Sequence, residues 1–415
     1  MPANAAFQLT DCTLLDTRTM RLVERSSVLV RGERIVEVAQ GEIKAADAAR
    51  LACRGRVLMP GLIDAHAHVT IVKVDPVSVL TQPQSLTTAM AARIMHGMLM
   101  RGFTSVRDAG GADSGLARAV EAGLFSGPRL FVSGRALSQT GGHADLRHPV
   151  DAFMGEPCGC AHLRDMTGRI ADGVSEVRRA ARDEIRLGAH QIKVMASGGV
   201  ASPTDPITVT QYSMEELRAI VEEAEAAETY VMAHAYAPRA IRRAVEAGIR
   251  SVEHGNLLDE ATAQLMAARG AYLVPTLATY QMLASHGRDL GFPPVSLAKL
   301  DTVLTAGTRS LEIAKRAGVK MGFGTDLLGE LHEHESIEFA IRAEVLSPAE
   351  IIASATIVNA EMMMRDEEIG VVAPGAFADL LVVDGNPLED LGLLQDQGAH
   401  LALIMKSGQL VKNAL

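Results

Sequence analysis

From about residue 58 to residue 370, short apolar runs alternate with longer segments whose apolar positions recur at helical spacing between charged residues. This alternation is typical of repeated β-α units, because strands of a parallel sheet are buried on both faces and the helices that cover them are amphipathic. The segment 213–227 is one such predicted helix, and Ser213 and Glu216 have the spacing of a capping box at its start. The apolar runs predict eight strands, over residues 57–66, 104–108, 130–134, 191–196, 230–234, 251–254, 272–275 and 320–325. Eight strands with intervening helices predict an α/β protein whose main domain is a closed TIM (β/α)8 barrel.

Strand-like pieces also occur at both ends of the chain, outside the predicted barrel. They cover residues 27–30, 34–38 and 50–53 near the N-terminus, and residues 378–383 and 401–406 near the C-terminus. Neither end has enough strands to bury a sheet face alone, so we expect the two ends to pair into one small β-sandwich. The predicted domains are a composite β-sandwich of residues 1–57 plus 372–415 and a β/α barrel of residues 58–371.

The composition indicates a large soluble protein. The chain has 415 residues, of which 48% are hydrophobic, and a formal net charge of −10. Acidic and basic residues are interspersed, which argues against nucleic acid and against an anionic membrane surface as partners. The first residues do not have the pattern of a secretory signal and no apolar run is long enough to span a bilayer, so we expect a cytoplasmic protein. Helices with Met and Ala are compatible with self-association, and we expect a homo-oligomer.

The four cysteines do not have the spacing of a disulfide framework, because Cys12 and Cys53 are far from Cys158 and Cys160. Only one residue separates Cys158 from Cys160, whereas zinc-binding cysteine pairs commonly have two or more residues between them. We therefore interpret this pair as incidental loop thiols rather than as a metal site or a redox pair.

The first predicted strand leads into two histidines, His66 and His68, with Ala67 between them. Because successive side chains of a strand alternate between its faces, both imidazoles point the same way and can hold one metal ion. Two histidines at this spacing are weak evidence alone.

Further ligand types stand at the ends of later predicted strands: Lys193 on the fourth, His234 on the fifth, His254 on the sixth and Asp326 after the eighth. The functional residues of a β/α barrel lie at the carboxyl ends of its strands, so we expect all of these side chains on one face. A single histidine at a strand end is more often structural, but six converging candidates favour a metal centre.

Lys193 is the unusual member of this set, because a protonated ammonium has no lone pair for a metal. Its apolar neighbours on a core strand disfavour the charge and favour the neutral amine. A neutral amine can add carbon dioxide to give a carbamate, whose two oxygens can bridge two cations. The alternative is a lysine that forms a salt bridge with a barrel carboxylate.

Motifs over nearly the whole chain resemble those of a known family. They lie in the segments 60–68, 104–111, 139–143, 191–199, 233–236, 251–255, 324–326 and 375–380. The chain resembles the amidohydrolase superfamily and, within it, the prolidase-like branch of Xaa-Pro dipeptidases, related carboxypeptidases and ochratoxin-type amidases. The His-Ala-His segment marks only the superfamily, whereas Gln-Thr-Gly-Gly-His (139–143) and His-Ala-Tyr (234–236) point to the branch.

The resemblance implies two divalent metal ions, with His66, His68 and Asp326 on one ion, His234 and His254 on the other, and carboxylated Lys193 bridging both. Zinc suits nitrogen and oxygen ligands, and the ligand types also permit manganese or cobalt. Two such cations would acidify a bridging water into the attacking hydroxide.

The resemblance also implies catalytic side chains. Asp326 would take the proton of the hydroxide and transfer it to the departing amine. His143 or Tyr236 would donate a hydrogen bond to the carbonyl oxygen. The alternatives for these two residues are a loop histidine and an aromatic residue that caps the barrel rim. Gly198 and Gly199 are interpreted as backbone that gives access to the metals rather than as a phosphate loop.

The predicted activity is hydrolysis of the amide or peptide bond to a C-terminal amino acid, in a dipeptide or an N-acyl amino acid. Leu327 and Leu328 follow Asp326 and predict an apolar wall for a bulky acyl group. Tyr280, His286 and Arg135 are more readily packing or surface residues than substrate contacts, and His332 and His334 are interpreted as loop residues.

Three other functions compete with this one. A cyclic amide or lactone hydrolase would share the two-metal centre. A deaminase of the same superfamily is disfavoured, because it usually has one metal and a glutamate shortly after the strand-five histidine, where this chain has Ala235 and Tyr236. A scaffold without activity should have lost some of the six candidate ligands, and all six are present.

Overall fold

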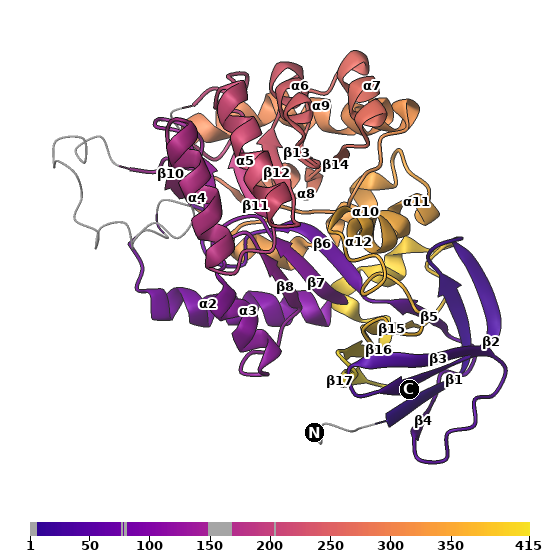
Figure 1. The fold of residues 1–415 in the computed structure, drawn as a ribbon. Helices are drawn as coiled ribbons and strands as arrows, with labels where there is room; N and C mark the ends of the chain where they lie inside the picture. The colour runs from indigo at the N-terminus through magenta and orange to yellow at the C-terminus, as the bar shows by residue number, and fades with distance from the viewer. Residues whose placement is uncertain (1–5, 76–77, 79–80, 148–167, 203–204) are drawn as a thin grey trace.

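The computed structural model describes residues 6–75, 78, 81–147, 168–202 and 205–415. Cys158 and Cys160 lie outside the described residues. Figure 1 shows a sheet in which the two ends of the chain meet, and a larger region in which helices surround the middle strands. Within the described ranges, none of the helices combines the length and the apolar character needed to cross a bilayer.

The two ends of the chain form one eight-stranded sheet, in the order β17-β16-β15-β5-β1-β2-β3 with β4 beside β1. Antiparallel pairing of β15 with β5 joins the C-terminal strands to the N-terminal ones, which confirms that the two ends pair. β5 and β15 are fully buried, because each is apolar throughout and has a strand on both sides. The two-layer sandwich and the domain limits stay predictions. The strands are β1 (Ala6–Asp16), β2 (Arg21–Arg31), β3 (Arg34–Gln40), β4 (Ala49–Ala52), β5 (Val57–Pro60), β15 (Leu380–Val383), β16 (Leu401–Lys406) and β17 (Gln409–Asn413).

The predicted strand over residues 57–66 is two strands, β5 and β6 (Leu62–Ala67), which belong to different sheets. The break falls at Gly61, whose N–H donates to the Asp379 carbonyl at 2.8 Å, while the next N–H, of Leu62, donates to Gly102 at 3.0 Å. A Cβ at residue 61 would lie 1.9 Å from the Thr104 hydroxyl oxygen, so only glycine fits here. One apolar run therefore serves both sheets.

The middle of the chain forms parallel sheets. One has the order β6-β7-β8 and the other β10-β9-β11-β12-β13-β14, and every pairing within them is parallel. Parallel strands with helices between them are consistent with the predicted barrel, and the closed ring stays a prediction. These strands are β7 (Phe103–Asp108), β8 (Arg129–Val132), β9 (Ala136–Ser138), β10 (Gly168–Ile170), β11 (Ile192–Met195), β12 (Val231–Ala235), β13 (Ser251–His254) and β14 (Tyr272–Val274).

The predicted eighth strand, over residues 320–325, is not a strand in the structure. Met321 forms a single parallel bridge with Leu273, and Phe323 accepts from the N–H of Ala65 at 2.8 Å. The Asn359 side chain also bonds both backbone groups of Phe323, at 3.1 and 2.8 Å. Because a side chain takes part of the hydrogen bonding that a ladder would use, the segment runs between β14 and β6 without forming a regular strand.

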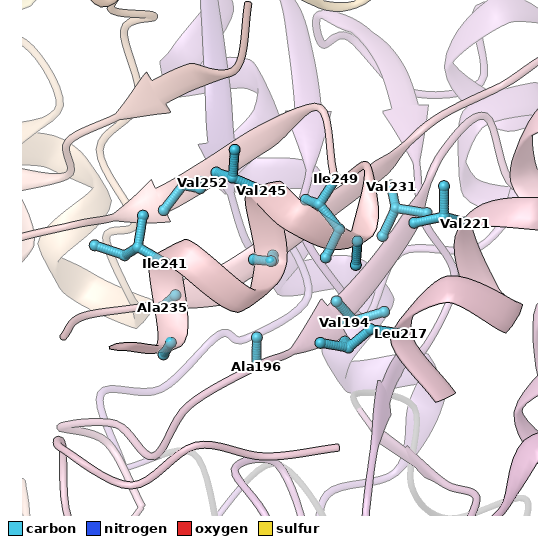
Figure 2. Close-up of a cluster of buried hydrophobic side chains, with 14 of the residues drawn as sticks. Val194, Ala196, Leu217, Val221, Val231, Ala235, Ile241, Val245, Ile249 and Val252 are labelled. Carbon is cyan, nitrogen blue, oxygen red and sulfur yellow. The ribbon is translucent and has the colours of Figure 1, made fainter. Parts of the chain in front are cut away.

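Helices pack against the parallel strands, as α5 and α6 do against β11, β12 and β13 (Figure 2). The predicted capping box starts α5, where the Ser213 hydroxyl accepts from the N–H of Glu216 at 3.1 Å and the Glu216 carboxylate accepts from the N–H of Ser213 at 2.7 Å. The helices are α2 (Gln84–Met100), α3 (Ser114–Glu121), α4 (Val174–Arg186), α5 (Met214–Ala226), α6 (Pro238–Ala247), α7 (Glu260–Arg269), α8 (Leu277–His286), α9 (Pro294–Ala317), α10 (Ile337–Arg342), α11 (Pro348–Ala353) and α12 (Asn359–Met362). Short 3-10 helices are η3 (Gly329–His334), η5 (Leu391–Leu394) and η6 (Asp396–Gly398), and η4 (Ser354–Val358) is a π-helix.

The core between strands and helices fixes which way the strand side chains point. Val194, Val231 and Val252 belong to one buried cluster with Leu217 of α5 and Ile241 of α6, as Figure 2 shows. Since side chains alternate along a strand, the residues beside these valines face the opposite side of the sheet. Lys193 and Met195 on β11 accordingly line an interior pocket.

Candidate metal centre

His66, His68 and Asp326 come together where β6 ends and where the segment of residues 320–325 ends. The Nε2 atoms of His66 and His68 lie 3.4 and 3.3 Å from the same Asp326 oxygen, Oδ1. One ligand atom from each of the three residues lies within 4.8 Å of the others. This spacing suits three ligands of one metal ion.

The other ring nitrogen of each of these histidines already has a partner. His66 Nδ1 lies 2.7 Å from Glu253 Oε2, and His68 Nδ1 lies 2.8 Å from the Gly110 carbonyl. Because a carbonyl only accepts, His68 donates through Nδ1 and leaves its Nε2 lone pair for a cation, and the Glu253 carboxylate favours the same tautomer at His66. Burial, together with Lys193, lowers the pKa of His66 well below its ordinary value. Burial alone would lower the pKa of His68, but the hydrogen bond to Asp326 and the charge of that carboxylate raise it.

The histidines around Asp326 keep its carboxylate ionised. Burial alone would raise its pKa, but His66, His68 and His254 around the carboxylate together hold the pKa well below its usual range. Its backbone has a positive φ of 53°, which few non-glycine residues adopt, aspartate more readily than most.

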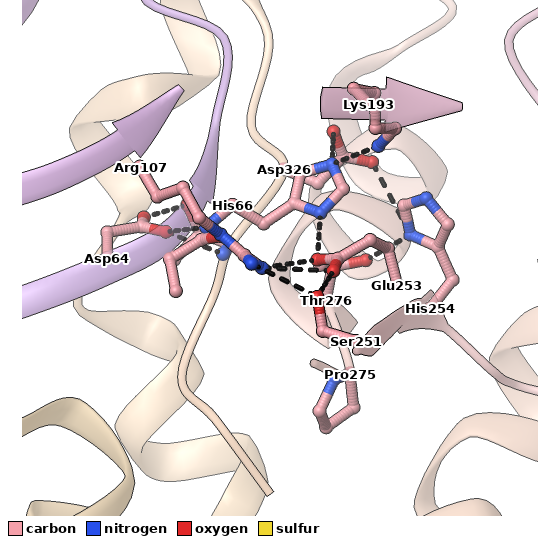
Figure 3. Close-up of polar contacts among 12 residues, drawn as sticks. Asp64, His66, Arg107, Lys193, Ser251, Glu253, His254, Pro275, Thr276 and Asp326 are labelled. Carbon is pink, nitrogen blue, oxygen red and sulfur yellow. Dashed lines mark hydrogen bonds and ion pairs between the residues drawn. The ribbon is translucent and has the colours of Figure 1, made fainter. Parts of the chain in front are cut away.

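Lys193 is 1% exposed and its Nζ lies 3.4 Å from His66 Nε2. Figure 3 shows it directed toward His66 and Asp326. Desolvation lowers its pKa to about 8. Among the described residues no carboxylate lies within ion-pair distance of Nζ. These residues therefore do not form the salt bridge that was the alternative for Lys193.

His234 and His254 lie beside this group, with ring centroids 4.6 Å apart. His234 donates through Nε2 to the Gly198 carbonyl at 3.1 Å, and His254 Nδ1 lies 2.8 Å from the Thr276 hydroxyl and 3.8 Å from Asp326 Oδ2. Strand alternation would turn His254 away from the face of Glu253, but its φ of 75° breaks the alternation and His254 lines the pocket. Burial lowers the pKa of His234 well below its ordinary value and that of His254 to about 3.

His143 and Tyr236 stand over these two histidines. The His143 ring stacks on His234 with centroids 4.3 Å apart, and the Tyr236 ring stacks on His254 at 5.1 Å. His143 Nδ1 lies 3.1 Å from Asp205 Oδ2, and the Tyr236 hydroxyl lies 2.8 Å from that of Tyr280. Both residues line the same pocket as the six predicted ligands, and His143 does so from the turn that follows β9.

The pocket has a volume of about 840 Å³ including its open mouth. Beyond the polar centre its walls are mostly apolar and include Ile71, Val200, Leu283 and Leu328. Leu328 lines the pocket as predicted, whereas Leu327 is fully buried in the cluster behind it.

The structure corrects two interpretations of single residues and agrees with two others. Tyr280 lines the pocket rather than serving only as packing. His332 lies in η3, is 3% exposed and donates to the His68 carbonyl at 3.3 Å, so it is a buried support of the site rather than a loop residue. Arg135 bonds Glu184 at 3.0 Å and His286 stacks on His334 with centroids 5.4 Å apart, in line with structural roles.

The residues that support the ligands were not predicted from the sequence. Glu253, Asp64, Asp205 and Thr276 each contact a predicted site residue or its backbone. Asp64 Oδ1, for example, accepts from the N–H of His66 at 2.9 Å and Oδ2 accepts from the Thr325 hydroxyl at 2.6 Å. A signal existed for two of them, since Asp64 precedes His66 by two residues and Glu253 directly precedes His254.

Comparison with known proteins places this geometry in a family. The model of the amidohydrolase family matches residues 57–411. Ochratoxinase from Aspergillus niger is 35% identical over 376 residues, which cover 86% of this chain and 76% of that protein.

Two solved structures extend the comparison. A prolidase in complex with N-methylphosphonate-L-proline is 54% identical with a TM-score of 0.95, covering 99% of this chain and 100% of that one. A Xaa-Pro dipeptidase with methionine bound in its active site is 27% identical with a TM-score of 0.85, covering 99% and 100%. The chain therefore belongs to the amidohydrolase family, in its prolidase-like branch, and is a hydrolase of amide or peptide bonds.

Proposed function

We propose that the chain is a binuclear-metal hydrolase that cleaves the bond between an acyl group and a C-terminal amino acid, in a dipeptide or an N-acyl amino acid. The observation that carries the proposal is that all six predicted ligands line one pocket: His66, His68, Lys193, His234, His254 and Asp326.

The donor set fits two divalent cations. His66, His68 and Asp326 would hold one, His234 and His254 the other, and carboxylated Lys193 would bridge them. The lowered pKa values of His66, His234 and His254 favour neutral imidazoles, which are the forms that bind metals. A buried amine with a pKa of about 8 has a neutral fraction that can react with carbon dioxide near neutral pH. Nitrogen and oxygen ligands favour zinc, with manganese and cobalt as alternatives.

When bound, two such cations supply Lewis acidity to the scissile carbonyl and lower the pKa of the attacking water. The chain's own side chains then move the protons. The ionised Asp326 carboxylate accepts a proton from the water as its oxygen bonds to the carbonyl carbon, and delivers that proton to the nitrogen as the C–N bond breaks. His143, which contacts Asp205, and Tyr236, which contacts Tyr280, would donate hydrogen bonds to the carbonyl oxygen.

The pocket walls support a substrate with an apolar acyl part. Ile71, Leu283 and Leu328 offer apolar surface next to the polar centre. The relatives agree with this chemistry, since one is a Xaa-Pro dipeptidase, one is an ochratoxinase, and the similar prolidase holds N-methylphosphonate-L-proline. A homo-oligomer in the cytoplasm stays a prediction from the sequence.

A substrate screen tests the proposal. Metal-replete protein is assayed with dipeptides, N-acyl amino acids, cyclic amides and lactones, with Lys193→Ala as the blank. Lys320→Ala, which removes a surface lysine paired with Glu361, serves as the control that should keep full activity. We expect hydrolysis of linear amides by the wild type and by Lys320→Ala only. Turnover confined to cyclic substrates would favour the competing hydrolase, and equal turnover by Lys193→Ala would remove the proposed role of this lysine.

A further inference from the structure

A fully buried carboxylate stands directly behind His66. Glu253, on β13, is 0% exposed, and its Oε2 lies 2.7 Å from His66 Nδ1. His66 is also 0% exposed, so water does not compete for this contact. Figure 3 shows Glu253 reaching His66 from the side away from Lys193.

Glu253 is itself fixed by two neighbours. Arg107 Nη2, on β7, donates to both carboxylate oxygens at 2.9 and 3.0 Å, and the Ser251 hydroxyl donates to Oε1 at 2.6 Å. Arg107 Nε donates to the carbonyl of Ala65, the residue before His66, at 2.6 Å. The carboxylate is therefore tied to three strands, β6, β7 and β13, and the guanidinium balances its charge.

This arrangement determines which nitrogen of His66 is free. With a carboxylate on Nδ1, the proton resides there and the Nε2 lone pair faces Lys193 and Asp326. Metal-binding histidines commonly have such a partner on the second nitrogen, and the partner orients the ring and raises its basicity.

We propose that Glu253 is a positioning residue of the metal centre, which acts on the bound cation through His66 and is held in place by Arg107 and Ser251. The inference rests on the proposed function, because it concerns the ion that His66 would hold.

The competing explanation is that Glu253 and Arg107 only stabilise the core. The chain offers a matched control for this, because Glu338 and Arg342 form another ion pair at 2.7 Å in which both side chains are 0% exposed. Arg342 donates to the carbonyls of Pro275 and Gly322, and Glu338 accepts from the N–H of Ala278. Within the part of the chain that the structure describes, neither residue forms a hydrogen bond or ion pair with any of the six predicted ligands, so this pair is a control for the loss of a buried ion pair.

The test measures affinity for Zn²⁺ rather than activity. Wild type, Glu253→Gln and Glu338→Gln are stripped with a chelator and titrated with Zn²⁺ against a chromophoric competitor, and their melting temperatures are recorded. We expect both variants to melt below the wild type, but only Glu253→Gln to lose about 10- to 100-fold in Zn²⁺ affinity. Equal losses of affinity in the two variants would overturn the proposal.

Glu253→Gln leaves Arg107 as an unpaired buried charge, which can prevent folding. The double variant Glu253→Gln with Arg107→Met removes both charges, and we expect it to fold and still to bind Zn²⁺ about 10- to 100-fold more weakly than the wild type. Wild-type affinity in this double variant would overturn the proposal. If the wild type binds Zn²⁺ and Glu253→Gln binds it equally well, only the role of Glu253 fails, whereas a wild type that binds no Zn²⁺ refutes the proposed function as well.

Discussion

A methyl group at residue 199 tests the placement of the His143 ring. A Cβ on Gly199 would lie 2.4 Å from His143 Cε1 and 2.7 Å from each ring nitrogen. Gly199 is not among the glycines with a positive φ, so alanine fits its backbone without strain. Any effect of Gly199→Ala should therefore come from the contact with His143.

The size of the effect follows from the overlap. Ordinary contact begins near 3.4 Å, so the ring must retreat by about 1 Å, away from its 3.1 Å contact with Asp205 and its stack on His234. Overpacking of this kind costs about 1–3 kcal/mol of unfolding free energy. A misplacement of about 1 Å can cost roughly 100-fold in rate, so we expect kcat/KM to fall by about that factor.

A double-mutant cycle with His143→Ala isolates the contact. Removing the ring leaves space for the new methyl group, so Gly199→Ala should cost little in kcat/KM or in unfolding free energy when His143 is already alanine. The assays are steady-state hydrolysis of a dipeptide and urea unfolding. An unchanged single variant, or the same loss in both backgrounds, would refute the placement of this ring.

Three further predictions concern the pocket wall, pH and metal removal. Leu328→Ser should lower kcat/KM for a bulky apolar N-acyl amino acid about 10-fold more than for the N-acetyl compound, because the apolar wall is lost, and equal loss on both would contradict it. Burial raises the pKa of Glu335 from 4.5 to about 7, so the native state retains a proton that the unfolded chain releases. This contribution to the unfolding free energy is complete below pH 4.5 and is lost as the pH rises through 7. Glu335→Gln should therefore make the unfolding free energy fall less steeply between these pH values. Urea unfolding at several pH values measures this slope, and a slope equal to that of the wild type would contradict the prediction. Chelation should abolish hydrolysis and lower the melting temperature, and Zn²⁺ should restore both; a stripped protein that melts like the untreated one would argue against a resident metal.

The apolar runs were sufficient to predict most strands of the parallel sheets, because such strands are buried on both faces. They could not show that the run over residues 57–66 divides at Gly61, since apolarity does not tell one sheet from another. The prediction of a strand over residues 320–325 was wrong for a related reason. Asn359 bonds the backbone of Phe323 from 36 residues away, and no local pattern contains that contact.

The candidate site likewise contains residues that the sequence could predict and residues that it could not. The six candidate ligands could be predicted because each is a chemically distinctive side chain at or near a strand end. Their supports could not, because a buried glutamate at residue 253 has meaning only once His66, 187 residues earlier, is known to lie against it. Tyr280 was interpreted as a packing residue for the same reason, since its hydroxyl is tied to the site through Tyr236, 44 residues earlier.

The central claim is that two cations share a carboxylated Lys193. A crystal structure of the metal-replete protein, with anomalous diffraction to locate the metals, tests it most directly. The account predicts two cations in the pocket and additional density for a carboxyl group on Lys193 Nζ, with one oxygen toward each cation. An unmodified lysine amine, or a single cation bound by His66, His68 and Asp326 alone, would contradict it.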